Sequence, residues 1–493
     1  MAYRGQIPHN DEQFGTIAQC AFRIAFCIAF LLSVVCINQP VQPDENSAPS
    51  FRYTVSVPTL DEDSIAFTLT VDEDCGFILP YHFYDNPLDS INGSLVRDLS
   101  IVDAQGDIID TSCSMEQIGP IQNRIVHLPA ASVYPVTITY RLDLSVVEHA
   151  ADDFPVPLVH ANGASLFFTG AYCFILPEIS SSLTTLWRTS FPVKLTYRTG
   201  SGINLYGIRD TVFTCQTLYE LLFLQMSAGP DPIVTGSGGG IAFQIVDFTG
   251  QTESPGMLDS MKTFFGTVLD NVTPLYGVVT ANRNFTIGIH DMSGALEGTW
   301  GFVMTRPDSI ARRSVFEVLA HEYLHCYMGI QCGEYNDQWW KEAAATYLAL
   351  EMCVRLGWYE KTVLEKKLAV ATVYSDPARF QRALSDPWLR AWKYPEQVHG
   401  IVYDRGAKVM MLLDVKVRSG SDNTYTLHDV MGDLCKRFKG RSFYRADFLE
   451  ALERFGAGDC SAFFTEYVDN SNDILTTGQL QEAFDQLSIF DGF

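Results

Sequence analysis

Hydrophobic and polar positions alternate with a period of two in the first half of this chain. The runs Ser64–Val71 and Val136–Leu142 place apolar side chains at every second position, and Gly, Pro and Asp separate runs of this kind. Such alternation predicts short strands with one buried face. The pattern continues from about residue 51 to 245, which predicts an antiparallel β-domain. The glycine-rich stretch 235–240 predicts a turn or junction near the end of that domain.

The spacing of apolar residues changes after this point. Between 246 and 355 it predicts a helix at Met257–Tyr276, strands at Phe285–His290 and Thr299–Thr305, and then two more helices. From 356 to 493 it is helical, and the predicted helices are Tyr359–Thr372, Tyr403–Val417, Leu427–Arg437, Arg445–Phe455 and Ala462–Tyr467. The predicted fold class is therefore α+β, with a β-rich domain at 51–245, a mixed domain at 246–355 and an α-helical region at 356–493.

Residues 1–50 form a separate tail with a hydrophobic segment and a polar linker. Ile24–Ile37 is apolar except for Ser33, a length typical of a signal peptide. Residues 14–37 are long enough to cross a bilayer if Arg23 reaches the interface. Both interpretations predict entry to the secretory route, as a secreted or membrane-anchored protein outside the cytoplasm. A buried core helix is a third interpretation of the same run.

Composition narrows the class of protein. With 493 residues, of which 47% are hydrophobic, the chain has material for two or three domains with their own cores. Its formal net charge of −24 argues against nucleic acid as a partner, because no basic surface is available to contact phosphates.

The most informative short pattern is His-Glu-Tyr-Leu-His at residues 321–325. Positions i and i+4 lie one above the other on a helix, so His321 and His325 can bind one Zn²⁺ together. Glu322 is then placed to act as a general base. The pattern has three fixed positions and arises by accident in roughly one chain in a hundred of this size, so a third ligand has to support it.

Glu342 is the candidate for that third ligand. It lies in the first turn of the next predicted helix, after the possible N-caps Asn336 and Asp337. A carboxylate among Trp and Ala residues is costly to bury unless it is paired or bound to a metal. An ordinary Glu favoured by the helix dipole is the alternative. Two His and one Glu would hold one Zn²⁺ per chain and leave a position for water, as catalytic zinc requires.

Three segments resemble the gluzincin metallopeptidases. His321–His325 followed by Trp339–Glu342 resembles their zinc-binding pattern, residues 293–302 resemble the exopeptidase motif of aminopeptidases, and residues 402–408 resemble their tyrosine segment. The resemblance implies a thermolysin-like zinc catalytic domain at 246–355. It also implies that Glu297, on an edge strand, binds the substrate's α-amino group and that Tyr403 stabilises the oxyanion.

Within the gluzincins, the chain resembles the glycyl aminopeptidase family. The segments that carry this resemblance are 78–80, 96–100, 103–107, 229–236, 412–414, 455–458 and 463–468, and the resemblance covers about 50–485. The chain ends too early for the PDZ domain that many relatives carry. Other departures are Ala343 and Ala344 after the third ligand, a shorter gap between His325 and Glu342, and Arg405 in place of Lys.

These observations predict a zinc-dependent aminopeptidase that acts on peptides with a free N-terminus. The resemblance implies a preference for small N-terminal residues such as Gly or Ala. Two alternatives stay open: a zinc endopeptidase of the same fold, in which Glu297 does not bind an amine, and a noncatalytic zinc-binding scaffold. Glu322 argues against the scaffold, because binding zinc requires only the ligands. A purely structural role also stays open for Glu297 and Tyr403.

Overall fold

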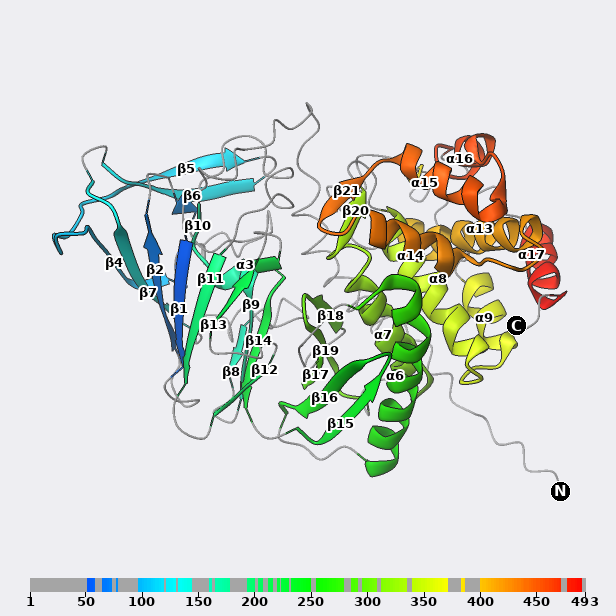
Figure 1. Cartoon of the computed structure of the whole chain (residues 1–493), viewed down its shortest axis with the longest axis horizontal. Helices are drawn as coiled ribbons and strands as arrows, with labels where there is room; N and C mark the ends of the chain where they lie inside the picture. The colour runs from blue at the N-terminus through cyan, green and yellow to red at the C-terminus, as the bar shows by residue number, and fades with distance from the viewer. Residues whose placement is uncertain are drawn as a thin grey trace, which may run out of the picture.

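The computed structural model describes residues 51–489 with gaps, the longest of which are 79–95, 144–158, 178–192, 371–382 and 386–399. Residues 1–50 and 490–493 lie outside the described residues, and so does the predicted signal or anchor segment at 14–37. Within the described part of the chain, no helix combines the length and the apolar character needed to cross a membrane. Figure 1 shows the β-sheets of the first half on one side and the helical region on the other.

The largest sheet of the β-rich part has six strands in the order β13-β11-β1-β2-β7-β4. The strands are β1 (Phe51–Val57), β2 (Ser64–Val71), β4 (Val96–Val102), β7 (Val136–Asp143), β11 (Val193–Thr199) and β13 (Val212–Cys215). Every second side chain of β2 is buried, which confirms the predicted alternation. All neighbours are antiparallel except β1 and β11, which run parallel. Alternation identifies a strand but not its direction, so the sequence did not indicate this pair.

Two four-stranded sheets complete the β-rich part. One has the order β10-β3-β6-β5 and the other the order β12-β14-β9-β8. Their strands are β3 (Phe77–Ile78), β5 (Ser112–Ile118), β6 (Ile121–His127), β8 (Val159–Ala161), β9 (Leu166–Thr169), β10 (Leu176–Pro177), β12 (Asn204–Tyr206) and β14 (Gln225–Gly229), and the short helix α3 (Gly170–Cys173) follows β9.

A five-stranded sheet lies between the β-rich part and the helices (Figure 1). Its order is β15-β16-β17-β19-β18, so β18 forms one edge, as the family resemblance implied. The strands are β15 (Val234–Gly238), β16 (Ile241–Asp247), β17 (Phe285–His290), β18 (Ala295–Gly298) and β19 (Gly301–Thr305). Strand β16 spans the predicted boundary at 245/246, and the domain boundaries stay predictions.

Helix α6 (Pro255–Tyr276) covers this sheet through Phe265, whose ring contacts Phe243, Phe285 and Phe302. The predicted glycine-rich turn is the tip of the β15–β16 hairpin. Gly239 and Gly240 there have φ of +54° and +78°, which favours glycine. A Cβ on Gly238 would lie 2.2 Å from the carbonyl oxygen of Gly266 on α6. Glycine therefore allows α6 to approach the hairpin closely.

The second half of the chain is helical, as predicted. Its elements are α7 (Arg312–His325), β20 (Cys332–Glu334), α8 (Trp339–Arg355), α9 (Lys361–Val370), the π-helix η3 (Gly400–Arg405), α13 (Gly406–Gly420), α14 (Leu427–Arg437), β21 (Arg441–Phe443), α15 (Arg445–Leu452), the π-helix η4 (Glu453–Ala457), α16 (Ser461–Tyr467) and α17 (Thr477–Ile489). Almost every side chain of α8 is buried, because this helix packs against both α7 and α13. The predicted helix Arg445–Phe455 is α-helical as far as Leu452 and continues into η4, where Gly456, with φ of +100°, makes a kink.

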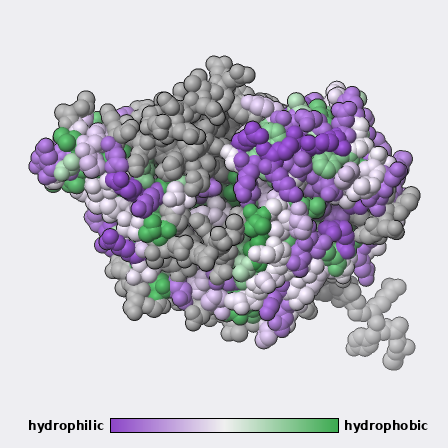
Figure 2. Space-filling model, viewed as in Figure 1, coloured by the Kyte–Doolittle hydropathy of each residue, from purple (hydrophilic) through white to green (hydrophobic). Residues whose placement is uncertain are grey.

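On the face shown in Figure 2, hydrophilic residues gather over β21, α14 and α15. Helix α14 is amphipathic: Leu427, Val430 and Leu434 are buried, and Asp433 forms ion pairs with Arg437 and Arg454 on the outer side. Exposed pairs of this kind stabilise a fold by less than about 1 kcal/mol each. The apolar face of α14 therefore holds the helix in place.

A buried polar network joins α8, α13 and α14. Glu351 accepts hydrogen bonds from Arg418 (3.0 Å) and contacts the imidazole of His428 (3.2 Å). Asp414 accepts from Arg418 (2.9 Å) and from the Tyr347 hydroxyl (2.7 Å). Burial raises the pKa of Glu351, but the hydrogen bond to His428 and the nearby cationic charges outweigh burial and lower this pKa from 4.5 to about 2.

Replacing this carboxylate should cost stability in a pH-dependent way. Because the folded-state pKa of Glu351 is depressed, its contribution is present above pH 4.5 and is lost as the pH falls toward 2. We expect Glu351→Gln to lower the free energy of unfolding by about 3 kcal/mol at neutral pH. Denaturant unfolding at several pH values would measure this difference, which should shrink toward zero near pH 2. Glu450→Gln, at an exposed pair with Arg437, is the control and should change stability by less than about 0.5 kcal/mol. A pH-independent loss would contradict this origin of the stability.

Candidate metal centre and peptidase site

Helix α7 presents its two histidines on one face, as their spacing requires. The Nε2 atoms of His321 and His325 lie 2.9 Å apart. The Nδ1 atom of His325 lies 3.3 Å from the carbonyl oxygen of Met328. A proton on Nδ1 that is donated to this carbonyl leaves Nε2 unprotonated and directed at His321, which is how a second partner orients a histidine that binds a metal.

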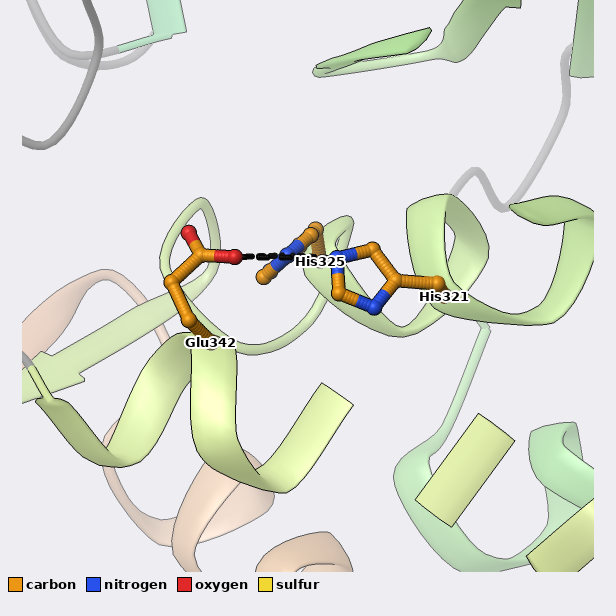
Figure 3. Close-up of side chains that lie close together, drawn as sticks. All are labelled: His321, His325 and Glu342. Atoms are coloured by element: carbon orange, nitrogen blue, oxygen red, sulfur yellow. Dashed lines mark hydrogen bonds and ion pairs between the residues drawn. The ribbon is translucent and has the colours of Figure 1, made fainter. Parts of the chain in front are cut away.

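Helix α8 brings Glu342 to the same point from its first turn (Figure 3). Its Oε2 atom lies 3.0 Å from His325 Nε2 and 3.6 Å from His321 Nε2. The next residue, Ala343, contacts the start of α13. A Cβ on Gly406 would lie 2.7 Å from the Cβ of Ala343, so small residues on both helices permit this approach.

These three donors fit a zinc ion. In a tetrahedral zinc site with bonds of about 2.0–2.1 Å, neighbouring ligand atoms lie about 3.3 Å apart, close to the three separations found here. Two imidazole nitrogens and one carboxylate oxygen are also the donor set of many catalytic zinc sites, with a fourth position for water. Among the described residues, His321, His325 and Glu342 form the one cluster of three such side chains close enough to share an ion.

The protonation states also suit metal binding. Burial and the neighbouring His325 lower the pKa of His321, which favours the neutral imidazole that coordinates metals. Burial raises the pKa of Glu342, but the interaction with His325, the charge of Lys341 and the hydrogen bonds to both histidines outweigh burial and hold this pKa well below its usual value. Glu342 is therefore ionised at neutral pH, as a zinc ligand has to be.

Glu322 lies beside the three donors without being one of them. Its side chain is buried, and its Oε2 atom has no hydrogen-bond partner among the described residues. Burial raises the pKa of Glu322 well above its ordinary value, and the charges of Glu297 and Glu342 raise it further. A buried carboxyl with an open oxygen and a raised pKa can both accept and return a proton near neutral pH.

Tyr403 reaches the site from the π-helix η3, an element that often marks functional positions. Its ring is nearly parallel to that of His321, with 6.2 Å between the ring centroids. Burial raises the pKa of Tyr403 well above its ordinary value, and so do the neighbouring carboxylates of Glu342, Glu297 and Glu322. The phenol therefore keeps its proton and can donate a hydrogen bond.

Glu297 lies on edge strand β18, and the structure brings it to the same cluster of carboxylates. The amide of Gln225 on β14 donates to the carbonyl oxygens of Leu296 and Glu297, both at 2.7 Å, and so joins this strand to the β-rich part. Gly298 leaves room for that contact, because its Cβ would lie 2.6 Å from the Gln225 side chain. Neither Gln225 nor its role could be recognised from the sequence, since the contact joins segments more than 70 residues apart.

Glu297 also has a partner that the sequence analysis missed. The ammonium nitrogen of Lys341 lies 2.6 Å from Glu297 Oε1 and 3.4 Å from Glu342 Oε1. Both Lys341 and Glu297 are almost fully buried, at 3% and 2% exposure. The sequence feature that could have indicated this partner is the position of Lys341, a charged residue directly before Glu342 in an otherwise apolar stretch.

No family model matches the chain, and no curated protein matches it in sequence. Solved structures match its fold. One is an aminopeptidase N family protein from Idiomarina loihiensis, with a TM-score of 0.67 and 15% identity over 87% of this chain and 78% of that one. Leukotriene A4 hydrolase from Saccharomyces cerevisiae has a TM-score of 0.56 and 14% identity over 87% and 69%. A variant of the M1 zinc metallopeptidase from Deinococcus radiodurans, bound to a Tyr-Ser-Ala substrate, has a TM-score of 0.53 and 15% identity over 86% and 95%.

The chain thus has the multidomain fold of the M1 zinc metallopeptidases, with an amino-terminal β-sheet region and a helical carboxy-terminal region. This confirms the predicted fold class. At these identities the similarity concerns the fold alone. The assignment to the glycyl aminopeptidases, the bound zinc and the roles of the six site residues remain predictions.

Removing the third ligand should release the metal. We expect the purified protein to hold about one zinc per chain. Glu342→Gln should weaken zinc binding by more than about 100-fold, since even changes to residues that only orient the ligands cost about 10–100-fold. Metal analysis after dialysis and titration against a chelating dye would measure both. Glu322→Gln is the matched control, because it alters a neighbouring carboxylate outside the ligand set. Unchanged zinc binding in Glu342→Gln would place the third ligand elsewhere.

Proposed function

We propose that this protein is a zinc-dependent aminopeptidase that hydrolyses the first peptide bond of peptides with a free N-terminus. The observation that carries the proposal is the meeting of His321, His325 and Glu342 at one point, with the buried carboxyl of Glu322 beside them. The similarity in fold to zinc metallopeptidases supports the same reaction class. A preference for a small N-terminal residue rests on the resemblance to glycyl aminopeptidases.

The ligand set His321, His325 and Glu342 would hold zinc and leave room for water. The chemistry that a bound zinc supplies is polarisation of the scissile carbonyl and acidification of that water. Glu322 accepts the water's proton on its open Oε2 atom and returns it to the departing amine. The raised pKa of Glu322 suits both steps, because the carboxyl can carry the proton between them.

Tyr403 would act on the carbonyl oxygen of the scissile peptide bond. Its phenol is protonated at neutral pH and lies beside His321, so it can donate a hydrogen bond to the oxygen on which negative charge develops. A donor fixed before the reaction stabilises a developing oxyanion strongly in a site that excludes water. The buried surroundings of Tyr403 meet that condition.

Glu297 would distinguish an aminopeptidase from an endopeptidase. Its carboxylate lies in the same cluster as Glu322, at a place where it can bind the α-ammonium group of a substrate. A specific observation also favours the endopeptidase as a second candidate: the ion pair between Glu297 and Lys341 already satisfies one carboxylate oxygen. An endopeptidase would need no free amine at this position.

We further propose that the protein enters the secretory route and acts outside the cytoplasm. This proposal rests on the hydrophobic segment at residues 14–37, which precedes the described part of the chain. The same segment provides for membrane association if it is retained as an anchor.

Paired substrates that differ only at the N-terminus would test the proposed function. A fluorogenic peptide with a free amine should have a kcat/KM about 10–100-fold higher than its N-acetylated form, the range of one charge-assisted hydrogen bond. A chelator should remove the activity and added zinc should restore it. Glu322→Gln should lose at least about 100-fold in kcat while it keeps its zinc. Equal rates on both peptides would favour the endopeptidase, and no hydrolysis by the zinc-loaded protein would refute a peptidase.

A further inference from the structure

Lys341 places an internal ammonium group where a substrate's ammonium group is expected to bind. It pairs with Glu297 Oε1 at 2.6 Å, and its charge also lies near Glu342. This lysine comes directly before the third zinc ligand, so helix α8 supplies both a metal ligand and the partner of the proposed amine-binding carboxylate.

The backbone around Lys341 holds its side chain in this position. Gly329 has φ of +107°, and a Cβ there would lie 2.5 Å from Lys341 Cε and 2.8 Å from Cδ. The aliphatic part of Lys341 therefore packs directly over the Gly329 backbone. A buried ammonium group that lost Glu297 would lack the carboxylate 2.6 Å away, so an incoming substrate cannot displace it without cost.

We propose that Lys341 is a specificity-determining residue that neutralises Glu297 and thereby weakens the enzyme's preference for a free N-terminal amine. This inference rests on the proposed peptidase function. The Glu297–Lys341 pair has no net charge, so it attracts a second ammonium group less than an isolated carboxylate would. The preference for a free-amine peptide over a neutral, acylated one is then smaller than it would be with an unpaired Glu297.

Lys341→Met tests this role, because it keeps the aliphatic stem and removes the charge. We expect the ratio of kcat/KM for free-amine over N-acetylated peptide to rise about tenfold, mainly through KM, as Glu297 becomes available to the substrate. In the inactive Glu322→Gln background, calorimetry should show the same change in the relative affinities for free and acetylated tripeptides. Lys361→Met, which removes the same charge from an ion pair with Glu365 within α9, is the matched control and should leave the ratio unchanged.

The Glu297→Gln variant separates a charge effect from a loosened pocket. If Lys341 acts through Glu297, the gain from Lys341→Met should vanish when Glu297→Gln is also present. A gain that persists in the double variant, or an unchanged ratio in Lys341→Met, would overturn the proposal. Should Lys341→Met fail to fold, Lys341→Gln replaces it, since its amide can still donate to Glu297. Failure of the peptidase function itself is distinct: the zinc-loaded wild-type protein would cleave neither substrate.

A second inference rests on an independent observation, the contact between two buried thiols. Cys332 on β20 and Cys435 on α14 have their sulfur atoms 2.9 Å apart, closer than an ordinary contact between non-bonded atoms. Strand β20 pairs with β21, and Gly440 N donates to the carbonyl oxygen of Gln331 (2.7 Å), so hydrogen bonds hold the backbone near both cysteines.

We infer that Cys332 and Cys435 form a disulfide when the protein folds in an oxidising environment. Each thiol loses its proton, one S–S bond forms, and the two electrons reduce a small disulfide such as oxidised glutathione to two thiols. The bond would tie the segment that follows the zinc helix α7 to helix α14, across 103 residues of chain.

Thiol mapping would test this bond. The protein, refolded with oxidised and reduced glutathione, is denatured in an alkylating reagent without reductant and then digested. Mass spectrometry should find Cys332 and Cys435 in one disulfide-linked pair, while Cys353, a buried thiol on α8, should be alkylated and serves as the control. Alkylation of both Cys332 and Cys435 would overturn the inference.

Discussion

Three carboxylates, Glu297, Glu322 and Glu342, lie buried in one site, and the cost of holding their charges away from water is the constraint on which the site depends. Lys341 compensates one of the three negative charges. A divalent cation at His321, His325 and Glu342 would compensate the other two when all three are ionised. The Lys341 ammonium group and a bound metal ion would thus together neutralise the three carboxylates. Loss of either would raise the cost of keeping the carboxylates ionised.

Helix α8 connects these charged groups to the rest of the fold. Its first turn supplies Lys341 and Glu342, and its last turns supply Glu351, which joins the buried network with Arg418 and His428. Polar contacts to α7 and β18 fix its first turn, and polar contacts to α13 and α14 fix the region around Glu351. The position of Glu342, the proposed third zinc ligand, is therefore coupled to the packing of α8 against α7 and α13.

The sequence predicted the contacts between residues close together in the chain and did not predict those between distant segments. The His321–His325 pair depends on the pitch of one helix, and the alternation in β2 depends on one strand, so neighbouring residues specify both. Glu342 could be predicted because its helix follows closely. Two contacts join distant segments and so have no signal in the local sequence: Lys341 with Glu297, and Gln225 with β18. The alternating pattern of β1 and β11 predicts strands but does not indicate that the two run parallel. Tyr403 was found through resemblance, and the π-helix that presents it has no period that the sequence reveals.

The three metal donors differ in their access to solvent. The side chain of His321 is 15% exposed, whereas those of His325 and Glu342 are 1% exposed. Among the described residues, a metal ion held by these side chains would therefore face solvent first at His321, whose ring is stacked with that of Tyr403. A chelator that approaches such a metal from solution would accordingly meet the His321 side first, with the phenol ring of Tyr403 as its neighbour.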